Sequence, residues 1–260
     1  MRPVGTSGFE LERDDVLGDS HVTVTVPLLR WDGPGPYAVA FSTRLGGSSE
    51  APFDSLNLGK LTEDEPERVA ENRRRLCLAT GAEATRLSFN RQVHGDSVLR
   101  ADPAAQGESG DGLWTDVPGH PLLVFSADCL PVVLAREQGE RPALALLHVG
   151  WRGLLAGVVE AGAAVLGRGR LHAAIGPGIG PCCYEVGDDV RRPFAARFGT
   201  HVLRGSHVDL WTAAEQALRA AGAVRVARAD LCTACRPQLY FSHRRDGART
   251  GRQGALAFVT

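Results

Sequence analysis

Two apolar runs in the middle of the chain, each ending near a reactive side chain, constrain the fold more than any other feature. The run 121–125 lies just before the segment 126–158, SADCLPVVLAREQGERPALALLHVGWRGLLAGV, and precedes Cys129. The run 142–147 lies within this segment and leads directly into His148. Short continuous apolar runs are typical of buried strands. We therefore expect two neighbouring strands that bring a thiol and an imidazole together at one edge of a sheet.

A third residue of this kind is His94, which follows the β-like run in FNRQVHGDSV. Taken singly, each of the three residues is more often structural, because buried cysteines and satisfied histidines are common. Both histidines are followed closely by glycine, which permits close approach of backbone or ligand. A Cys/His/His set with one position left open is the ligand arrangement of a catalytic zinc ion. We predict that His94, Cys129 and His148 bind this metal and form the catalytic site.

Composition narrows the classes of protein to which the chain can belong. Its 260 residues fit one large domain. The N-terminal residues lack the apolar core of a signal peptide, and no apolar run approaches the roughly 20 residues of a membrane-spanning helix. The net charge of -1 favours neither nucleic acid nor an anionic membrane. We expect a cytoplasmic protein without nucleic-acid or membrane partners, which holds any anionic ligand locally.

Strand-like and helix-like segments follow one another without strict alternation. The polar, aperiodic residues 1–20 are expected to form a flexible tail, and residues 21–260 a single catalytic domain. The predicted strands have alternating or continuous apolar patterns; they cover 21–29, 37–43, 86–93, 121–127, 131–135, 142–149, 171–176, 224–229, 238–243 and 255–260. The predicted helices cover 66–81, 151–166, 188–198 and 210–221. Successive strands indicate an α+β fold, a single domain of mixed β-sheets flanked by helices.

Because the chain has almost no net charge, an anionic ligand must be bound by a local group of cationic side chains, and arginines provide them. Arg44 begins a long loop after the predicted strand 37–43, and long ordered loops often carry function. Arg244 and Arg245 lie in FSHRRDGARTGRQ, where four arginines cluster around glycines. We predict that Arg44, Arg244 and Arg245 bind phosphate, with a solvated basic loop as the alternative. Arg152 in GWRG is a weaker candidate.

The chain has six cysteines, and without a secretory signal metal binding or catalysis outranks a disulfide framework. Cys182 and Cys183, together with Cys232 and Cys235 of the CTAC motif, could provide four thiolates to a structural zinc ion. Adjacent cysteines do not give the usual C-x-x-C geometry, so this cluster ranks below the histidine-containing site. The glycine-rich segment 176–187 is a poor phosphate loop, because prolines remove amide donors and no GKS or GKT follows.

A series of ordered sequence blocks carries a family resemblance. The blocks are FSTRLGGSS, SLNLG, ENRRRL, QVHGDSV, ADCLPVVL, HVGWRG, IGPGIGPCCYEVG, DLCTAC, FSHRRDG and TGRQ. Over roughly residues 37–260 they resemble the YfiH-like family, also known as the polyphenol oxidase or laccase-domain family. The resemblance implies the YfiH-like fold and a metal held by His94, Cys129 and His148.

The resemblance also implies a zinc-dependent purine nucleoside phosphorylase. Its substrates would be phosphate with adenosine, inosine or methylthioadenosine, and its products the free base with ribose 1-phosphate or the methylthio analogue. Adenosine deaminase activity would accompany it, and a role in editing peptidoglycan precursors is attached to relatives. The usual nucleobase deaminase signature is absent, because His94-Gly95-Asp96 is not H-x-E and PCCYE is not P-C-x-x-C. Deamination would therefore need a different geometry.

The older description of the family as laccases can be tested against the number and spacing of the histidines. Multicopper sites use many histidines in paired H-x-H motifs, whereas this chain has eight histidines and no such pair. Three borderline ligands suit a single zinc ion better. We predict Zn2+ as the cofactor, with Cu2+ binding only adventitiously and no laccase reaction as the main activity.

The residues alone leave two other functions open. Without a metal, Cys129 and His148 would form a thiolate–imidazole dyad that hydrolyses an amide or ester, for example in peptidoglycan precursor editing. The second alternative is a zinc-stabilised binding module without catalytic activity. Metal analysis separates the dyad from the other two functions, and product analysis with adenosine and phosphate separates an enzyme from a binding module.

Overall fold

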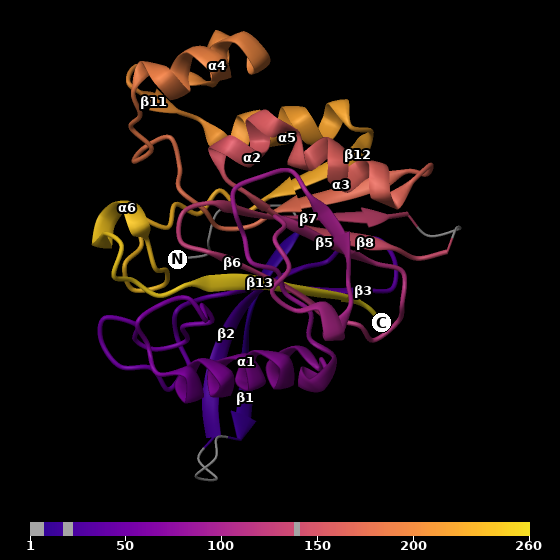
Figure 1. Cartoon of the computed structure of the whole chain (residues 1–260), viewed down its shortest axis with the longest axis vertical. Helices are drawn as coiled ribbons and strands as arrows, with labels where there is room; N and C mark the ends of the chain where they lie inside the picture. Colours follow the sequence, from indigo (N-terminus) through magenta and orange to yellow (C-terminus); the bar gives the residue numbers. More distant parts are fainter. Residues whose placement is uncertain (1–7, 18–22, 138–140) are drawn as a thin grey trace.

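Two β-sheets form the centre of the molecule, with helices on the outer face of each (Figure 1). The computed structural model describes residues 8–17, 23–137 and 141–260. One sheet has the strand order β1-β2-β3-β13-β6, and the other the order β12-β9-β7-β8-β5-β4. This is the predicted α+β arrangement of mixed sheets flanked by helices, and the prediction of fold class is confirmed.

The five-stranded sheet is antiparallel throughout. Its strands are β1 (Phe9–Leu17), β2 (Thr23–Trp31), β3 (Tyr37–Ser42), β13 (Gln253–Val259) and β6 (Leu122–Ser126). Helix α1 (Pro66–Thr80) packs against its outer face. Proline is favoured in the first turn of a helix, and Gly81 ends α1 in the left-handed conformation with φ 74°.

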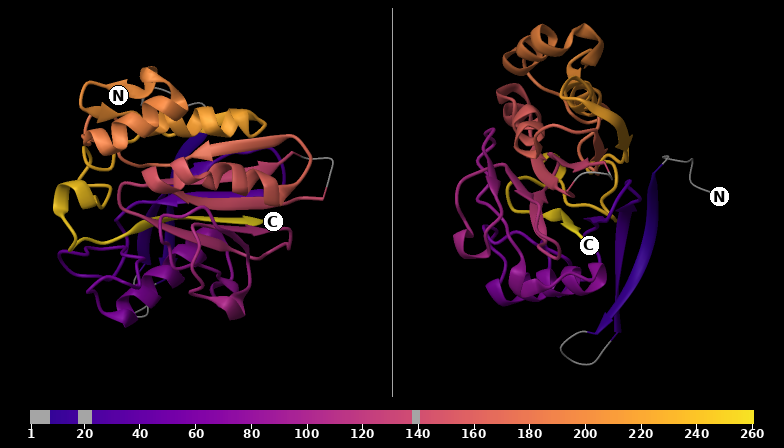
Figure 2. Two further views of the ribbon diagram at one scale, coloured as in Figure 1. Left: turned by 45° about the horizontal axis from the view of Figure 1, so that its top comes forward. Right: turned by 90° about the vertical axis from the view of Figure 1, so that its right-hand side faces the viewer.

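The six-stranded sheet combines parallel and antiparallel neighbours. Its strands are β12 (Ala223–Arg228), β9 (Leu171–Ile175), β7 (Leu130–Arg136), β8 (Leu144–Val149), β5 (Gly112–Thr115) and β4 (Val98–Arg100). Its outer face carries α2 (Trp151–Ala156), α3 (Val158–Leu166) and α5 (Leu210–Ala220), with α4 (Asp188–Phe198) at the far end of the molecule (Figures 1 and 2).

Short elements complete the described chain. They are the 3-10 turns η1 (Ala84–Arg86), η2 (Pro103–Ala105) and η3 (Thr200–Val202), the hairpin of β10 (Leu203–Arg204) with β11 (His207–Val208), and helix α6 (His243–Asp246). None of the helices in the described ranges combines the length and the apolar composition that crossing a bilayer requires.

Alternate side chains of the central strands enter two different cores. In β8, Ala145 and Leu147 pack toward the helices, whereas Leu144 and Leu146 pack between the two sheets. All four side chains are fully buried. A strand that is buried on both faces has no polar positions, which explains why the sequence shows continuous apolar runs here instead of alternation.

Two predictions near the N-terminal half were wrong in part. Residues Phe9–Leu17 form β1 and pair with β2, although their polar sequence predicted a tail. Residues 1–7 and 18–20 of that predicted tail lie outside the described residues. The predicted strand 86–93 is absent, because this described segment makes only isolated bridges at Ser88 and Arg91. In both cases, whether the segment forms a strand depends on its pairing with another segment, which a local sequence pattern does not reveal.

Two further predictions were wrong in their local detail. The predicted helix 151–166 is divided into α2 and α3 by Gly157, which has φ 107° in the left-handed region that glycine tolerates. The predicted strand 238–243 is a turn that leads into α6, because Tyr240 N–H donates to the Arg236 carbonyl at 3.0 Å instead of to a sheet neighbour.

Candidate metal centre

Cys129 and His148 lie together at one edge of the six-stranded sheet. Cys129 immediately precedes β7, and His148 is the penultimate residue of β8. The two strands are antiparallel neighbours with Pro131 opposite His148, so the start of one strand lies beside the end of the other. His148 is buried and Cys129 is half-buried. The two side chains therefore meet at one sheet edge as expected, but the run 121–125 that was expected to lie beside β8 forms β6 of the five-stranded sheet, and β7 takes its place.

His94 reaches the same place from a loop and not from a strand end. Its backbone has φ 62°, which is uncommon for a residue other than glycine. The buried carboxylate of Asp111 holds this loop by accepting three backbone hydrogen bonds: from Val93 at 3.1 Å, His94 at 2.9 Å and Gly95 at 2.7 Å. A carboxylate with several amide donors is a strong local anchor.

Asp111 also orients His148. It directly precedes β5, the sheet neighbour of β8, and its Oδ1 lies 2.8 Å from Nδ1 of His148. Because a carboxylate accepts, His148 donates from Nδ1 and presents Nε2 to the metal site. Burial raises the pKa of Asp111, but His148 and the amides of Gly95 and Val93 outweigh burial and lower it. Asp111 was not predicted from the sequence, in which its only signal is its position immediately before a short strand.

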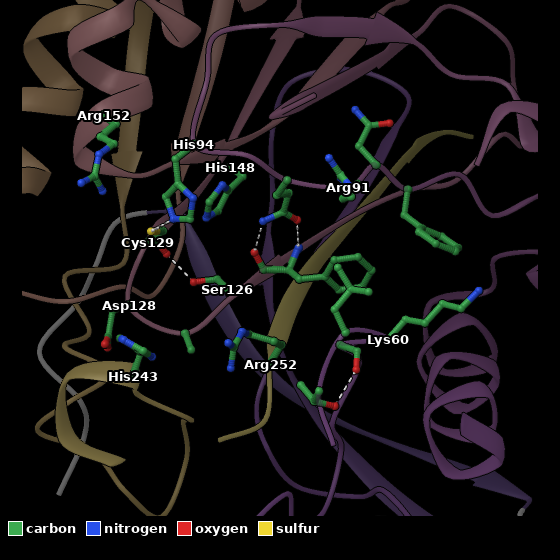
Figure 3. A pocket seen from close by; sticks show the side chains of 18 of the residues that line it. Lys60, Arg91, His94, Ser126, Asp128, Cys129, His148, Arg152, His243 and Arg252 are labelled. Atoms are coloured by element: carbon green, nitrogen blue, oxygen red, sulfur yellow. Dashed lines mark hydrogen bonds between the residues drawn. The ribbon is translucent and has the colours of Figure 1, made fainter. Parts of the chain in front are cut away.

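The three predicted ligands converge on one point (Figure 3). Nε2 of His94 lies 3.8 Å from Sγ of Cys129, and the two imidazole rings are 4.9 Å apart at 77°. One ligand atom from each residue lies within 4.8 Å of the others. Tetrahedral zinc, with bonds of ~2.3 Å to sulfur and ~2.05 Å to nitrogen, would place such atoms about 3.5 Å apart.

The donor set fits zinc in chemistry as well as in spacing. Two imidazoles and a thiolate are preferred zinc ligands, and three of them leave a fourth position open. Metal-bound histidines commonly donate their second nitrogen to a carboxylate, as His148 does to Asp111. The arrangement can therefore hold a zinc ion that remains accessible to a ligand.

The same contacts polarise the thiol when no metal is bound. Burial raises the pKa of Cys129, but the neighbouring His148 and His94 lower it to about 6. Burial lowers the pKa of His148, whereas Cys129 and Asp111 raise it to about 9. Near neutral pH the metal-free pair is thus a thiolate beside an imidazolium, and the thiolate is the form that binds metals and attacks electrophiles.

Gly150 makes this convergence sterically feasible. A Cβ atom at this position would lie 2.9 Å from Cδ2 of His94 and 3.0 Å from Sγ of Cys129. These separations are shorter than ordinary van der Waals contact. The glycine that the sequence places two residues after His148 is therefore required by the approach of the two other ligands.

The three ligands open into a cavity of about 760 Å³, a size typical of small-molecule sites. Its aromatic lining consists of Phe89, Phe125, Trp151 and Tyr184. Its cationic lining includes Lys60, Arg73, Arg91, Arg152, Arg244 and Arg252. Figure 3 shows Arg152 and Arg252 on either side of the ligands, with Lys60 and Arg91 farther along the cavity. The cavity combines apolar surface with positive charge.

Among the described residues that line the cavity, Arg244 is the one member of the predicted phosphate trio. Arg44 donates to the Asp54 carbonyl at 2.7 Å and pairs with the Asp54 carboxylate at 3.0 Å, with its guanidinium over the ring of Phe241. Arg245 pairs with Asp246 at 2.6 Å. The contacts of Arg44 and Arg245 fasten loops, and a direct role for either in phosphate binding stays a prediction.

The sequence is similar to known proteins over most of its length. Residues 38–260 match the family described as multi-copper polyphenol oxidoreductase laccase. A purine nucleoside phosphorylase of Pseudomonas aeruginosa is 39% identical over 241 residues, covering 88% of this chain and 96% of that protein. The purine nucleoside phosphorylase YfiH of Escherichia coli is 36% identical over 240 residues, covering 88% and 97%. The chain belongs to the YfiH-like family.

Solved structures show the same fold for this YfiH-like protein. The YfiH protein of Bacillus licheniformis superposes with a TM-score of 0.84 at 28% identity, covering 90% of this chain and 96% of that one. YlmD of Geobacillus stearothermophilus gives 0.82 at 31% identity, covering 89% and 96%. The YfiH-like fold expected from the sequence blocks is confirmed.

Proposed function

We propose that this protein is a zinc-dependent purine nucleoside phosphorylase with His94, Cys129 and His148 as the zinc ligands. The observation that carries the proposal is the opening of this donor set into a cavity with aromatic walls and arginine side chains. The Pseudomonas aeruginosa and Escherichia coli relatives, both named purine nucleoside phosphorylases, support the activity. The proposed substrates are phosphate with adenosine, inosine or methylthioadenosine, and we place the reaction in the cytoplasm.

The metal and the chain have separate tasks in this proposal. Zinc bound at the site supplies Lewis-acid stabilisation of negative charge on an oxygen nucleophile. Asp111 fixes Nε2 of His148 toward the site through the 2.8 Å contact at Nδ1, and it fixes His94 through the backbone amides. Groups that are oriented before substrate arrives need no reorganisation during the reaction.

Arginines anchored by backbone carbonyls are the proposed phosphate clamp. Nη1 of Arg244 donates to the Glu185 carbonyl at 2.6 Å. Nη1 of Arg252 donates to the carbonyls of Thr250 and Gly251 at 2.7 and 2.9 Å. Each guanidinium keeps further N–H donors for an anion, and its orientation is already set. We propose that Arg244 and Arg252 hold phosphate, while Arg44 and Arg245 position the surrounding loops.

The aromatic wall is the proposed purine subsite. The guanidinium of Arg73 lies 4.3 Å from the ring centre of Phe89 and 4.9 Å from that of Phe125. Gln92 holds the backbone of Phe125 on both sides, accepting from its N–H at 2.7 Å and donating to its carbonyl at 2.8 Å. A fixed aromatic surface of this kind can stack against a planar base. We propose that this wall orients the base while Arg244 and Arg252 hold the anion.

Product analysis tests the proposal. Purified protein with adenosine is expected to release adenine and ribose 1-phosphate only when phosphate is present. A chelator should stop the reaction, and zinc should restore it. Formation of inosine from adenosine would reveal the proposed deaminase side activity. Phosphate-independent turnover, or no turnover of any purine nucleoside by zinc-loaded protein, would refute the phosphorylase assignment.

A metal-free hydrolase is the second candidate, because Cys129 and His148 form a polarised pair. The lowered pKa of Cys129, about 6, with His148 raised to about 9, is the signature of an activated thiol. Such an enzyme, acting for example on peptidoglycan precursors, would work in the presence of a chelator and lose activity on alkylation of Cys129. The phosphorylase would show the opposite response to the chelator.

A further inference from the structure

A second group of potential metal ligands lies outside the site described above. It consists of Cys182, Cys183, Cys232 and Cys235, and we refer to it as the four-cysteine cluster. We propose that this cluster binds a second zinc ion, which has a structural role and crosslinks two loops.

Sheet topology brings the two loops together. β9 and β12 are parallel neighbours, so the loops that follow them leave the same edge of the sheet. Gly178 and Cys232 form a bridge between these loops, with Gly178 N–H donating to the Leu231 carbonyl and Thr233 N–H to the Gly178 carbonyl, each at 3.2 Å. Backbone hydrogen bonds therefore hold the cysteines of both loops side by side.

The sulfur atoms have the spacing of a tetrathiolate site. Sγ of Cys235 lies 3.4 Å from that of Cys182 and 3.3 Å from that of Cys183. All four sulfur atoms lie within 4.8 Å of one another. Four bonds of ~2.3 Å at tetrahedral angles would separate sulfur atoms by about 3.8 Å. A tetrahedral set of four sulfurs is a characteristic zinc environment.

The adjacent cysteines are compatible with this geometry despite their unusual spacing in the sequence. The backbone turns sharply here, because the N–H groups of Cys183 and Tyr184 both donate to the Gly180 carbonyl at 3.0 Å. This turn lets both neighbouring thiols reach Cys235. Convergence of four thiols distinguishes the cluster from a disulfide, which would join only two of them.

A hydrogen bond from the protein backbone also suits a metal thiolate. The N–H of Gly180 donates to Sγ of Cys232 at 3.3 Å, and Cys232 is only 5% exposed. Partners of this kind orient ligands and stabilise their charge at metal sites. Cys182 and Cys235 are exposed, so an ion can enter from solvent.

The cluster would stabilise one wall of the cavity. Thr233, between two of its cysteines, donates from Oγ1 to Asp128 at 2.6 Å, and Asp128 is the neighbour of Cys129. The carbonyl of Glu185, two residues after Cys183, accepts from Arg244. An ion that joins the two loops would therefore restrict both Asp128 and Arg244.

Metal analysis of the full-length protein provides the test. Protein purified under reducing conditions without chelator should contain about two zinc ions per chain. Cys129→Ala should leave about one, and the double change Cys182→Ser with Cys235→Ser should also leave about one. Cys77→Ala, which removes a buried cysteine that belongs to neither group, should leave the metal content unchanged. Circular dichroism checks that each variant folds. If the double variant does not fold, the single variant Cys235→Ala replaces it in the metal analysis.

Cobalt spectroscopy separates the two sites directly. Co2+ added to metal-stripped Cys129→Ala should still give strong sulfur-to-cobalt charge-transfer absorption, because four thiolates remain. Hydrogen exchange in residues 178–187 should slow when zinc is restored to this variant. Loss of all such absorption in Cys129→Ala would overturn the proposal. A disulfide between Cys235 and Cys182 or Cys183, found without a second metal ion, would overturn it as well.

Discussion

Asp111 and His148 contact each other twice: Oδ1 lies 2.8 Å from Nδ1 of the ring, and the His148 N–H donates to the Asp111 carbonyl at 2.7 Å. The backbone contact fixes the register of β5 against β8, and the side-chain contact fixes the imidazole. The same carboxylate holds the backbone of His94. One acidic residue thus positions two of the three proposed metal ligands.

Asp111→Asn tests this positioning role. The substitution keeps the size of the side chain but removes the charge that orients His148, so zinc affinity should fall by about 10- to 100-fold. Competition with a chromophoric chelator measures the affinity. Asp116→Asn, at the other end of β5 where Asp116 pairs with Arg100, is the matched control and should bind zinc as the wild type does. Equal affinities for Asp111→Asn and the wild type would contradict the role of Asp111.

The polarised thiol predicts a pH dependence of alkylation. In metal-stripped protein, His148 and His94 overcome the effect of burial and lower the pKa of Cys129 to about 6. The thiolate fraction, and with it the rate of labelling by iodoacetamide, should rise as pH increases through about 6, well below the ~8.5 of a free cysteine. Peptide mass spectrometry follows Cys129 alone. His148→Ala should move the midpoint upward, and a midpoint that stays in place would show that His148 is not the cause.

Substitution of Cys129 distinguishes a metal ligand from a nucleophile. Cys129→Asp keeps an anionic zinc donor and should retain some metal and some activity, whereas Cys129→Ala should lose both together. Zinc content and phosphate-dependent release of adenine are measured on the same samples. A fully inactive Cys129→Asp protein that retains its zinc, combined with chelator-resistant activity in the wild type, would favour the hydrolase.

Arg244→Ala tests the phosphate clamp. Loss of a charge-assisted contact of about 1.5–3 kcal/mol should raise the KM for phosphate by about tenfold or more. The KM for adenosine should change much less. Arg192→Ala, which removes an exposed arginine of α4 paired with Asp188, should alter neither constant. An unchanged KM for phosphate would remove Arg244 from the clamp, and the same assay on Arg44→Ala tests the prediction made for that residue.

Gly150→Ala tests the steric requirement at the metal centre. The added methyl group would press against His94 and Cys129 at 2.9 and 3.0 Å, so zinc affinity should fall while the circular dichroism spectrum stays that of a folded protein. Gly95→Ala is the matched control, because its methyl group would meet only atoms at 3.6 Å and beyond. Isothermal titration with zinc compares the two. Equal zinc affinities would show that the His94 loop accommodates the methyl group without weakening metal binding.

The sequence predicted the parts of the site that depend on local pattern. The thiol and His148 lie at one sheet edge as predicted, but the strand that pairs with β8 is β7, which follows Cys129. The run before Cys129 forms β6, which belongs to the other sheet. His94 lies beside Cys129 and His148 as the sequence predicted, and its role as a metal ligand stays a prediction. It lies in a loop held by Asp111, however, and does not follow a strand. That carboxylate could not be recognised in advance, because its role arises from the pairing of β5 with β8 and not from any neighbour in the sequence.

Clusters of arginines in the sequence did not distinguish the arginine that lines the cavity from those that pair with acidic residues. Arg44, Arg244 and Arg245 have the same chemistry, yet Arg44 and Arg245 are engaged by Asp54 and Asp246 while Arg244 lines the cavity. Side-chain direction on loops depends on tertiary contacts that composition does not record. The β1 strand is a similar case, because it forms by pairing with β2 although its polar sequence does not indicate a strand.

The position of β13 between β3 and β6 in the five-stranded sheet has a consequence for synthesis. The residues of β3 and β6 leave the ribosome long before Gln253–Val259, so until then each has an open edge on the side that β13 will cover. Exposed edges can pair with other chains. The nascent protein therefore passes through a period of vulnerability to aggregation, which ends when β13 pairs with both strands.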